Sequence, residues 1–162
     1  MPRFVPVATT DELAPGGAKQ VQAASAHIPG KQLAKPVMVT LDGTLAMAVL
    51  PASDRVDVER LKAAAGARTV ALANEQDFQD RFPECEVGAM PPFGNLYGLE
   101  VWVAARLAAA EELAFNAGDH TELIRMAYRD FDRLVQPQVG QFCSTQARSL
   151  VPRSDPGYRG KR

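Results

Sequence analysis

The chain has 162 residues, of which 46% are hydrophobic and 23% charged, values typical of an ordinary soluble domain that buries about 70% of its unfolded surface. Its net charge of −1 argues against a broadly basic surface that coats nucleic acid, so we expect no DNA partner. No apolar run approaches the roughly 20 residues of a membrane span, and residues 1–17 lack the basic-then-apolar order of a signal peptide. We therefore expect a cytoplasmic protein without a membrane partner.

The N-terminal part of the chain predicts a hairpin after an irregular start. Residues 1–20 carry proline and glycine and show no sustained hydrophobic period, so we expect an irregular N-terminal arm. Residues 37–50 instead form two apolar runs joined at Asp42-Gly43, a dipeptide that favours tight hairpin turns. Two antiparallel strands are the prediction for this segment.

Short helices and a strand are predicted next. Residues 57–66 predict a helix that begins after Asp57 as N-cap and ends at Gly66. Residues 69–72 predict a strand, and residues 74–82 predict a second short helix capped by Asn74.

The C-terminal part mixes strands with an ambiguous segment. Residues 99–103 and 112–115 predict two further strands, whereas residues 121–135 fit either one helix or a strand followed by a helix. Residues 146–162 combine basic residues with turn formers, which predicts a mobile basic tail. Hairpins mixed with short helices, without regular βαβ alternation, indicate an α+β domain.

Cysteine and histidine give no sign of a metal site. Cys85 and Cys143 are far apart and match no ligand spacing, so we expect two free thiols. His27 and His120 stand in no order typical of a nucleophilic triad. The chain has neither a Walker loop nor a GxGxxG motif, so we expect no nucleotide cofactor and no metal.

Two charged or titratable residues stand beside predicted elements. Lys35 directly precedes the first strand of the hairpin, where a rigid element could hold its side chain in a cleft. Most lysines at such positions are simply exposed to solvent. His120 follows the sequence NAGD and could face a site or serve as a structural cap.

Two glycine-bearing turns are candidates for the rim of a pocket. They are GAMPPFG, residues 88–94, and Asn116-Ala117-Gly118, and both stand next to predicted strands. Each could be only a tight turn. Together they could hold backbone N–H groups open toward developing negative charge.

Three segments in order carry a resemblance to a known family. They are AHIPGKQLAKPVMVTLDGTLAMAVLPASDRVDVERLKAAAGARTVALA, CEVGAMPPFG and FNAGDHTELIRM. Together, over residues 24–140, they resemble the YbaK/EbsC family of aminoacyl-tRNA deacylases, which is related to the editing domain of prolyl-tRNA synthetase. The resemblance implies an α+β fold with a mixed, barrel-like β-sheet and peripheral helices. It implies a deacylase domain at residues 21–145 and favours a strand near residues 121–127 before a helix.

The resemblance also implies a function. It is the hydrolysis of the ester that joins a wrong amino acid to the 3′ end of tRNA, without a metal or cofactor and in contact with mischarged tRNA and an aminoacyl-tRNA synthetase. Lys35 would orient the ester or water, and the backbone around Gly88 would stabilise the oxyanion. The implied substrate-binding residues are Pro92, Phe93, Gly94, Asn116, Ala117, Gly118 and His120.

The chain departs from the family pattern at three places, and a second hypothesis depends on them. Residues 5–25 match the usual pocket cover poorly, Ala104 stands where many relatives carry aspartate, and Pro36 follows Lys35 in place of threonine. The alternative to an enzyme is a catalytically silent module of the same fold. Such a module would bind a tRNA end, an amino-acid-like ligand or a synthetase.

Overall fold

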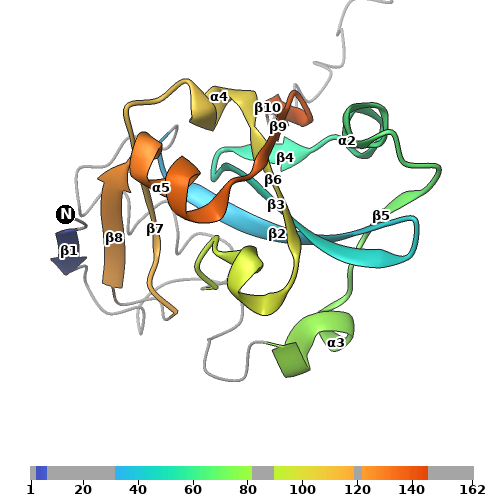
Figure 1. Ribbon diagram of the computed structural model, residues 1–162, viewed down its shortest axis with the longest axis horizontal. Helices are drawn as coiled ribbons and strands as arrows, with labels where there is room; N and C mark the ends of the chain where they lie inside the picture. Colours follow the sequence, from blue (N-terminus) through green and yellow to red (C-terminus); the bar gives the residue numbers. More distant parts are fainter. Residues whose placement is uncertain (1–2, 7–31, 82–89, 119–121, 146–162) are drawn as a thin grey trace, which may run out of the picture.

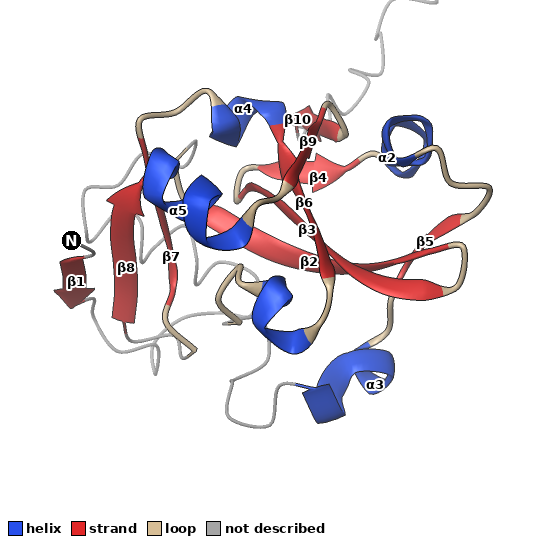
Figure 2. Cartoon of the chain, in the orientation of Figure 1, coloured by secondary structure: helices blue, strands red, loops and turns tan. Residues whose placement is uncertain are grey.

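The structure, a computed structural model, describes residues 3–6, 32–81, 90–118 and 122–145. The strands form sheets of five, three and two strands, and Figures 1 and 2 show that the short helices lie around them at the periphery. The strands are β1 (Arg3–Pro6), β2 (Ala34–Leu41), β3 (Thr44–Pro51), β4 (Asp54–Val56), β5 (Val70–Leu72), β6 (Glu100–Ala104), β7 (Glu112–Asn116), β8 (Glu122–Ala127), β9 (Gln138–Gly140) and β10 (Cys143–Thr145). The helices are α2 (Val58–Ala65), α3 (Glu75–Phe78), α4 (Ala105–Ala108) and α5 (Tyr128–Val135), with the 3₁₀ segments η2 (Gln79–Arg81) and η3 (Gly94–Tyr97).

The central sheet has five strands in the order β5-β2-β3-β6-β9. β2 pairs antiparallel with β3 and β5, whereas β6 runs parallel to both β3 and β9, so the sheet is mixed. The predicted hairpin is confirmed, with Leu41 opposite Thr44 and positive φ angles of 50° at Asp42 and 80° at Gly43. Positive φ at both central residues is what a tight hairpin turn requires, which explains the Asp-Gly pair.

The second sheet has three strands in the order β1-β8-β7, all antiparallel. Here the prediction of an irregular arm over residues 1–20 is wrong at Arg3–Pro6, because this segment pairs with β8. Four residues that include Pro6 are too few to show a strand's alternation, and the hydrogen bonds that make them a strand come from β8.

Both predicted helices of the first half are present. The Asp57 carboxylate accepts a hydrogen bond from the Arg60 backbone at the start of α2, and Gly66 ends the helix with φ of 63°. At α3 the Asn74 backbone N donates to the Asp77 carboxylate at 2.9 Å, one half of a capping box.

The ambiguous segment is a strand followed by a helix, β8 and then α5. β8 is held on both sides, by β1 and β7, which explains why a sequence that also fits a helix is extended here. β4, β9 and β10 were not predicted, because three residues carry no readable period.

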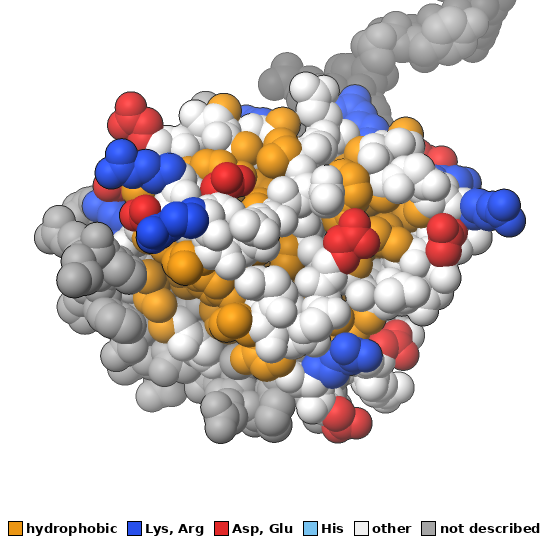
Figure 3. All heavy atoms as spheres, in the orientation of Figure 1, with side chains coloured by type: hydrophobic (Ala, Val, Ile, Leu, Met, Phe, Trp, Pro, Cys, Tyr) orange, Lys and Arg blue, Asp and Glu red, His pale blue; other side chains and the backbone are white. Residues whose placement is uncertain are grey.

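Side chains alternate across the central sheet and form a hydrophobic core on each of its faces. The core under α5 includes Met38, Met47, Val101, Phe115 and Phe131. The core under α2 includes Val39, Ala48, Leu61, Trp102 and Phe142. Figure 3 shows one face of the surface, where acidic and basic side chains are interspersed with hydrophobic ones, in keeping with the net charge of −1.

Candidate active site

Lys35 is the second residue of β2 and lies opposite Leu50 of β3. Its half-buried side chain crosses toward the turn after β3, where Nζ donates a hydrogen bond to the Ala52 carbonyl at 3.2 Å. Burial lowers the pKa of Lys35, the Asp54 carboxylate raises it and the Arg55 guanidinium lowers it, in that order of size. The structure therefore holds this ammonium at a rigid, partly desolvated position.

Asn116, the last residue of β7, is an unusual buried amide. Only 4% of it is exposed, and its Oδ1 has no hydrogen-bond partner among the described residues. Since most buried polar atoms are paired, an unpaired acceptor of this kind is a candidate position for a hydrogen bond from a ligand.

A bridge between the two sheets brings Lys35 and Asn116 to corresponding positions. Leu33 and Ala114 form a parallel β-bridge, and the Ala114 backbone N donates to the Gln32 carbonyl at 2.8 Å. Lys35 and Asn116 each follow this bridge by two residues on chains that run in the same direction. Their sequence neighbours Ala34 and Phe115 belong to the core under α5. Because successive side chains of a strand point to opposite faces, the side chains of Lys35 and Asn116 point away from that core.

Met90 to Gly94, the described part of the GAMPPFG segment, contact the core under α5. The Phe93 ring packs edge-on against Phe115 at 5.3 Å and Phe131 at 5.6 Å between centroids, so it anchors this segment in the core. Pro92 and Gly94 are buried. A Cβ on Gly94 would lie 3.1 Å from Val101 Cγ2 and 3.2 Å from Met47 Cβ, so glycine is needed here for close packing.

The structure therefore separates the expected site residues into two groups. Phe93 and Gly94 pack in the core under α5, whereas the side chains of Lys35 and Asn116 lie on the other faces of their strands. Phe115 links the groups, because it touches Phe93 and directly precedes Asn116. Part of the loop is thus fixed to the strand end that carries the orphaned amide.

The remaining expected residues lie at or beyond the edge of the described chain. Ala117 and Gly118 are half-buried, and Gly118 has φ of 104°, a conformation that favours glycine. Gly88, His120, His27 and Cys85 lie outside the described residues.

Sequence reasoning missed a buried ion pair beside Lys35. Asp54 is 1% exposed, and its Oδ2 accepts a hydrogen bond from Arg106 Nη1 at 2.8 Å. Its Oδ1 is buried without a hydrogen-bond partner of ordinary geometry. Burial first, and then the Asp54 carboxylate, raise the pKa of the Cys143 thiol. No sequence signal joins these residues, because Asp54 and Arg106 are 52 positions apart.

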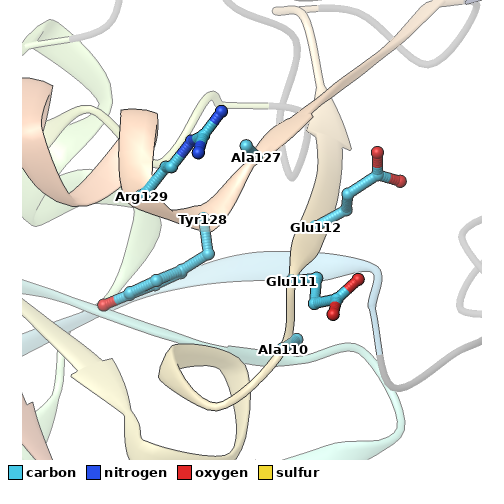
Figure 4. A pocket seen from close by; sticks show the side chains of 6 residues that line it. All are labelled: Ala110, Glu111, Glu112, Ala127, Tyr128 and Arg129. Atoms are coloured by element: carbon cyan, nitrogen blue, oxygen red, sulfur yellow. The ribbon is translucent and has the colours of Figure 1, made fainter.

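Two surface hollows lie away from Lys35 and Asn116. The first, about 500 Å³, is lined by Ala110, Glu111, Glu112, Ala127, Tyr128 and Arg129. Figure 4 shows its two carboxylates on the β7 side and the Tyr128 ring directed away from them. It lies at the start of β7, whereas Asn116 ends that strand. The second, about 460 Å³, borders the β2–β3 turn and Gly98.

Within the described ranges, no three His, Cys, Asp or Glu side chains gather as a metal site would require. No helix in this part of the chain is both long and apolar enough to cross a membrane.

Comparisons with known proteins connect this geometry to one family. The sequence model of the aminoacyl-tRNA editing domain matches residues 16–134. Two relatives, both named multifunctional Ser/Thr-tRNA deacylase ProXp-y, come from Escherichia coli K12 and O157:H7. Each is 29% identical over 100 residues, which make up 61% of this chain and 59% of the relative. The chain thus matches less than two thirds of the length of these relatives.

Solved structures share the fold. One is the crystal structure of a proposed trans-editing enzyme for prolyl-tRNA synthetase, with a TM-score of 0.73, 16% identity and coverage of 88% of this chain and 87% of that one. Another, hypothetical protein APE2540, has a TM-score of 0.73 and 16% identity, with coverage of 89% and 92%. The expected α+β, YbaK-like fold is confirmed. The family match covers most of the chain, and the protein therefore belongs to the aminoacyl-tRNA editing domain family.

Proposed function

We propose that the protein hydrolyses the ester bond of mischarged aminoacyl-tRNA and so releases the amino acid and free tRNA. The observation that carries the proposal is that the rigidly held Lys35 ammonium and the unpaired Asn116 oxygen lie at corresponding positions after one β-bridge, in a chain of the editing-domain family. The deacylase domain is inferred to span residues 21–145. Its proposed partners are mischarged tRNA and an aminoacyl-tRNA synthetase. Its proposed location is the cytoplasm.

The proposed reaction is attack of water on the ester carbonyl carbon. A new C–O bond forms, the bond to the ribose oxygen breaks, and that oxygen leaves as a hydroxyl with the proton that water gives up. The Lys35 ammonium orients the ester or water and offsets negative charge, while the Gly88 amide stabilises the oxyanion. The segment Asn116 to Gly118, with His120, lines the place of the aminoacyl group and terminal ribose, and Pro92 to Gly94 support that segment from the core under α5.

The test is a panel of mischarged tRNAs, with release of free amino acid as the measurement. Ser-tRNA and Thr-tRNA come first, because the E. coli relatives are named for these substrates, and Ala-tRNA and Pro-tRNA follow. We expect hydrolysis of at least one substrate and binding that tracks the 3′ aminoacyl end. Binding without hydrolysis across the panel would favour the silent binding module instead, which the deacylase relatives do not favour.

The chemistry proposed here requires no metal, so a chelator of transition metals should leave deacylation unchanged. Incubation with 1,10-phenanthroline avoids stripping the Mg²⁺ that tRNA needs, and the non-chelating 1,7-isomer is the matched control. Loss of activity with the first compound alone, restored by added Zn²⁺, would overturn the metal-free mechanism.

The Gly88→Val substitution should slow the chemical step by about 10²-fold, because a branched side chain would crowd the site or turn away one oxyanion donor. Single-turnover hydrolysis measures this step, and binding of uncharged tRNA should change less. Ala71→Val, which places the same side chain on an exposed strand position, is the control and should behave as wild type. Equal hydrolysis rates for the two variants would show that the GAMPPFG segment is only a tight turn and does not act in the chemical step.

A further inference from the structure

Asp54 is a buried carboxylate that the proposed reaction leaves without a role. It begins β4, which pairs with β10, and one of its oxygens is held by Arg106 from α4 at 2.8 Å. Burying a charge costs free energy unless a partner compensates it, and the Arg106 guanidinium supplies that partner. The other oxygen, Oδ1, remains buried and unsatisfied.

The Asp54 carboxylate stands next to the turn that holds Lys35. The Lys35 ammonium donates to the carbonyl of Ala52, and the chain reaches Asp54 two residues later. An ammonium has three N–H donors, so the bond to Ala52 leaves others that can face a carboxylate. Asp54 also counteracts the effect of burial on the pKa of Lys35, as expected for opposite charges held near each other.

We propose that Asp54 is a positioning residue for Lys35, whose buried carboxylate is fixed by Arg106 and keeps the ammonium charged and in place for the ester. This inference rests on the proposed function of Lys35. Arg106 holds the carboxylate through Oδ2, and the Ala52 carbonyl holds the ammonium two residues before Asp54, so rigid contacts keep the two opposite charges near each other. Asp54 itself does not touch the reacting atoms.

The charged and titratable groups of this cluster come from four elements. Lys35 belongs to β2, Asp54 and Arg55 to β4, Arg106 to α4 and Cys143 to β10. Among the described residues, Asp54 is the carboxylate that raises the pKa of Lys35, and the Cys143 thiol stays protonated because its own pKa is raised. Without the Asp54 charge, the remaining influences on the pKa of Lys35 are burial and the Arg55 guanidinium, and both lower it.

The decisive variant is Asp54→Asn, which keeps the side-chain shape and removes the charge. We expect kcat to fall by about tenfold or more with little change in KM, and the alkaline limb of the kcat profile to move to lower pH. The direction follows because Asp54 raises the pKa of Lys35, so the ammonium is lost at lower pH without it. Asp54→Glu, which keeps the charge, should recover part of the activity.

A second measurement does not depend on activity. The Lys35 ammonium is titrated by NMR in protein with ¹³C-labelled lysine, and its signal is assigned by its absence from Lys35→Ala. We expect the Lys35 titration to move to lower pH in Asp54→Asn and to stay in place in Asp130→Asn. Asp130 is a matched control because it forms a surface ion pair with Arg133 on α5.

The outcomes separate the two proposals. An unchanged Lys35 titration in folded Asp54→Asn would make Asp54 purely structural and overturn this inference. If the Lys35 titration shifts in Asp54→Asn but the wild type hydrolyses no mischarged tRNA, the coupling between Asp54 and Lys35 stands. The proposed function is then wrong. If Asp54→Asn does not fold, Arg106→Lys keeps the positive charge and loosens the carboxylate. It should lower kcat several-fold, and wild-type kcat in that variant would contradict the inference.

Discussion

Replacing Lys35 by alanine is expected to lower deacylation by about 10³-fold while leaving the fold intact. The ammonium is half-buried and fixed by the Ala52 carbonyl, so it can act on the reacting ester without first being ordered. Its removal deletes one hydrogen bond to the half-buried turn after β3 and leaves the apolar contacts of β2 in place. Single-turnover hydrolysis of the best tRNA substrate, with circular dichroism of both proteins, measures the two expectations.

Lys62→Ala is the matched control for this substitution. Lys62 lies in the last turn of α2, on a separate element, and its loss should leave turnover at the wild-type level. Wild-type turnover by Lys35→Ala itself would remove Lys35 from the mechanism. Equal losses in the two variants would indicate a general effect of positive charge on tRNA binding, and not a role in the site.

The Phe131→Ala variant should lose about 3–5 kcal/mol of the free energy of unfolding, because it leaves a cavity in the core under α5. Phe131 is fully buried and contacts the rings of both Phe93 and Tyr128. Deacylation should fall as well, since Phe93 then loses one of the two rings that anchor its loop. Urea denaturation measures the stability, and turnover below the unfolding transition measures the effect on the loop.

Leu134→Ala on the same helix is the control for Phe131→Ala. Leu134 is 52% exposed, so its truncation removes little buried surface and should cost well under about 1 kcal/mol. A similar loss in both variants would show that α5 is sensitive to any substitution. Full activity of folded Phe131→Ala would show that the loop does not depend on the Phe93 anchor.

Local features of the fold could be predicted because their causes lie within a few residues. The turn at Asp42-Gly43 follows from the positive φ angles that this dipeptide tolerates. The ends of α2 follow from the Asp57 carboxylate and from Gly66, each within one turn of the group it serves. Lys35 could be singled out for the same reason, since it stands beside a strong apolar run, although the structure places it inside β2 and not before it.

The candidate site was only partly predictable, because its residues meet through contacts between distant segments. The NAG segment drew attention as a turn, but the burial of Asn116 and its orphaned oxygen depend on how β7 meets the start of β2. Phe93 drew attention as an implied substrate-binding residue, but its ring contacts with Phe115 and Phe131 come from two later elements.

The sequence by itself determined the hairpin, the caps of α2 and the family, since turn chemistry, capping and motif order are all legible along the chain. Only the tertiary structure decided that Arg3–Pro6 is a strand, because its hydrogen-bond partners belong to β8. It also decided that Asp54 meets Arg106 across 52 positions. The composition around Asp54 does not differ from that of an exposed segment. Packing of β4 against α4 gives Asp54 its partner and allows its carboxylate to raise the pKa of Lys35.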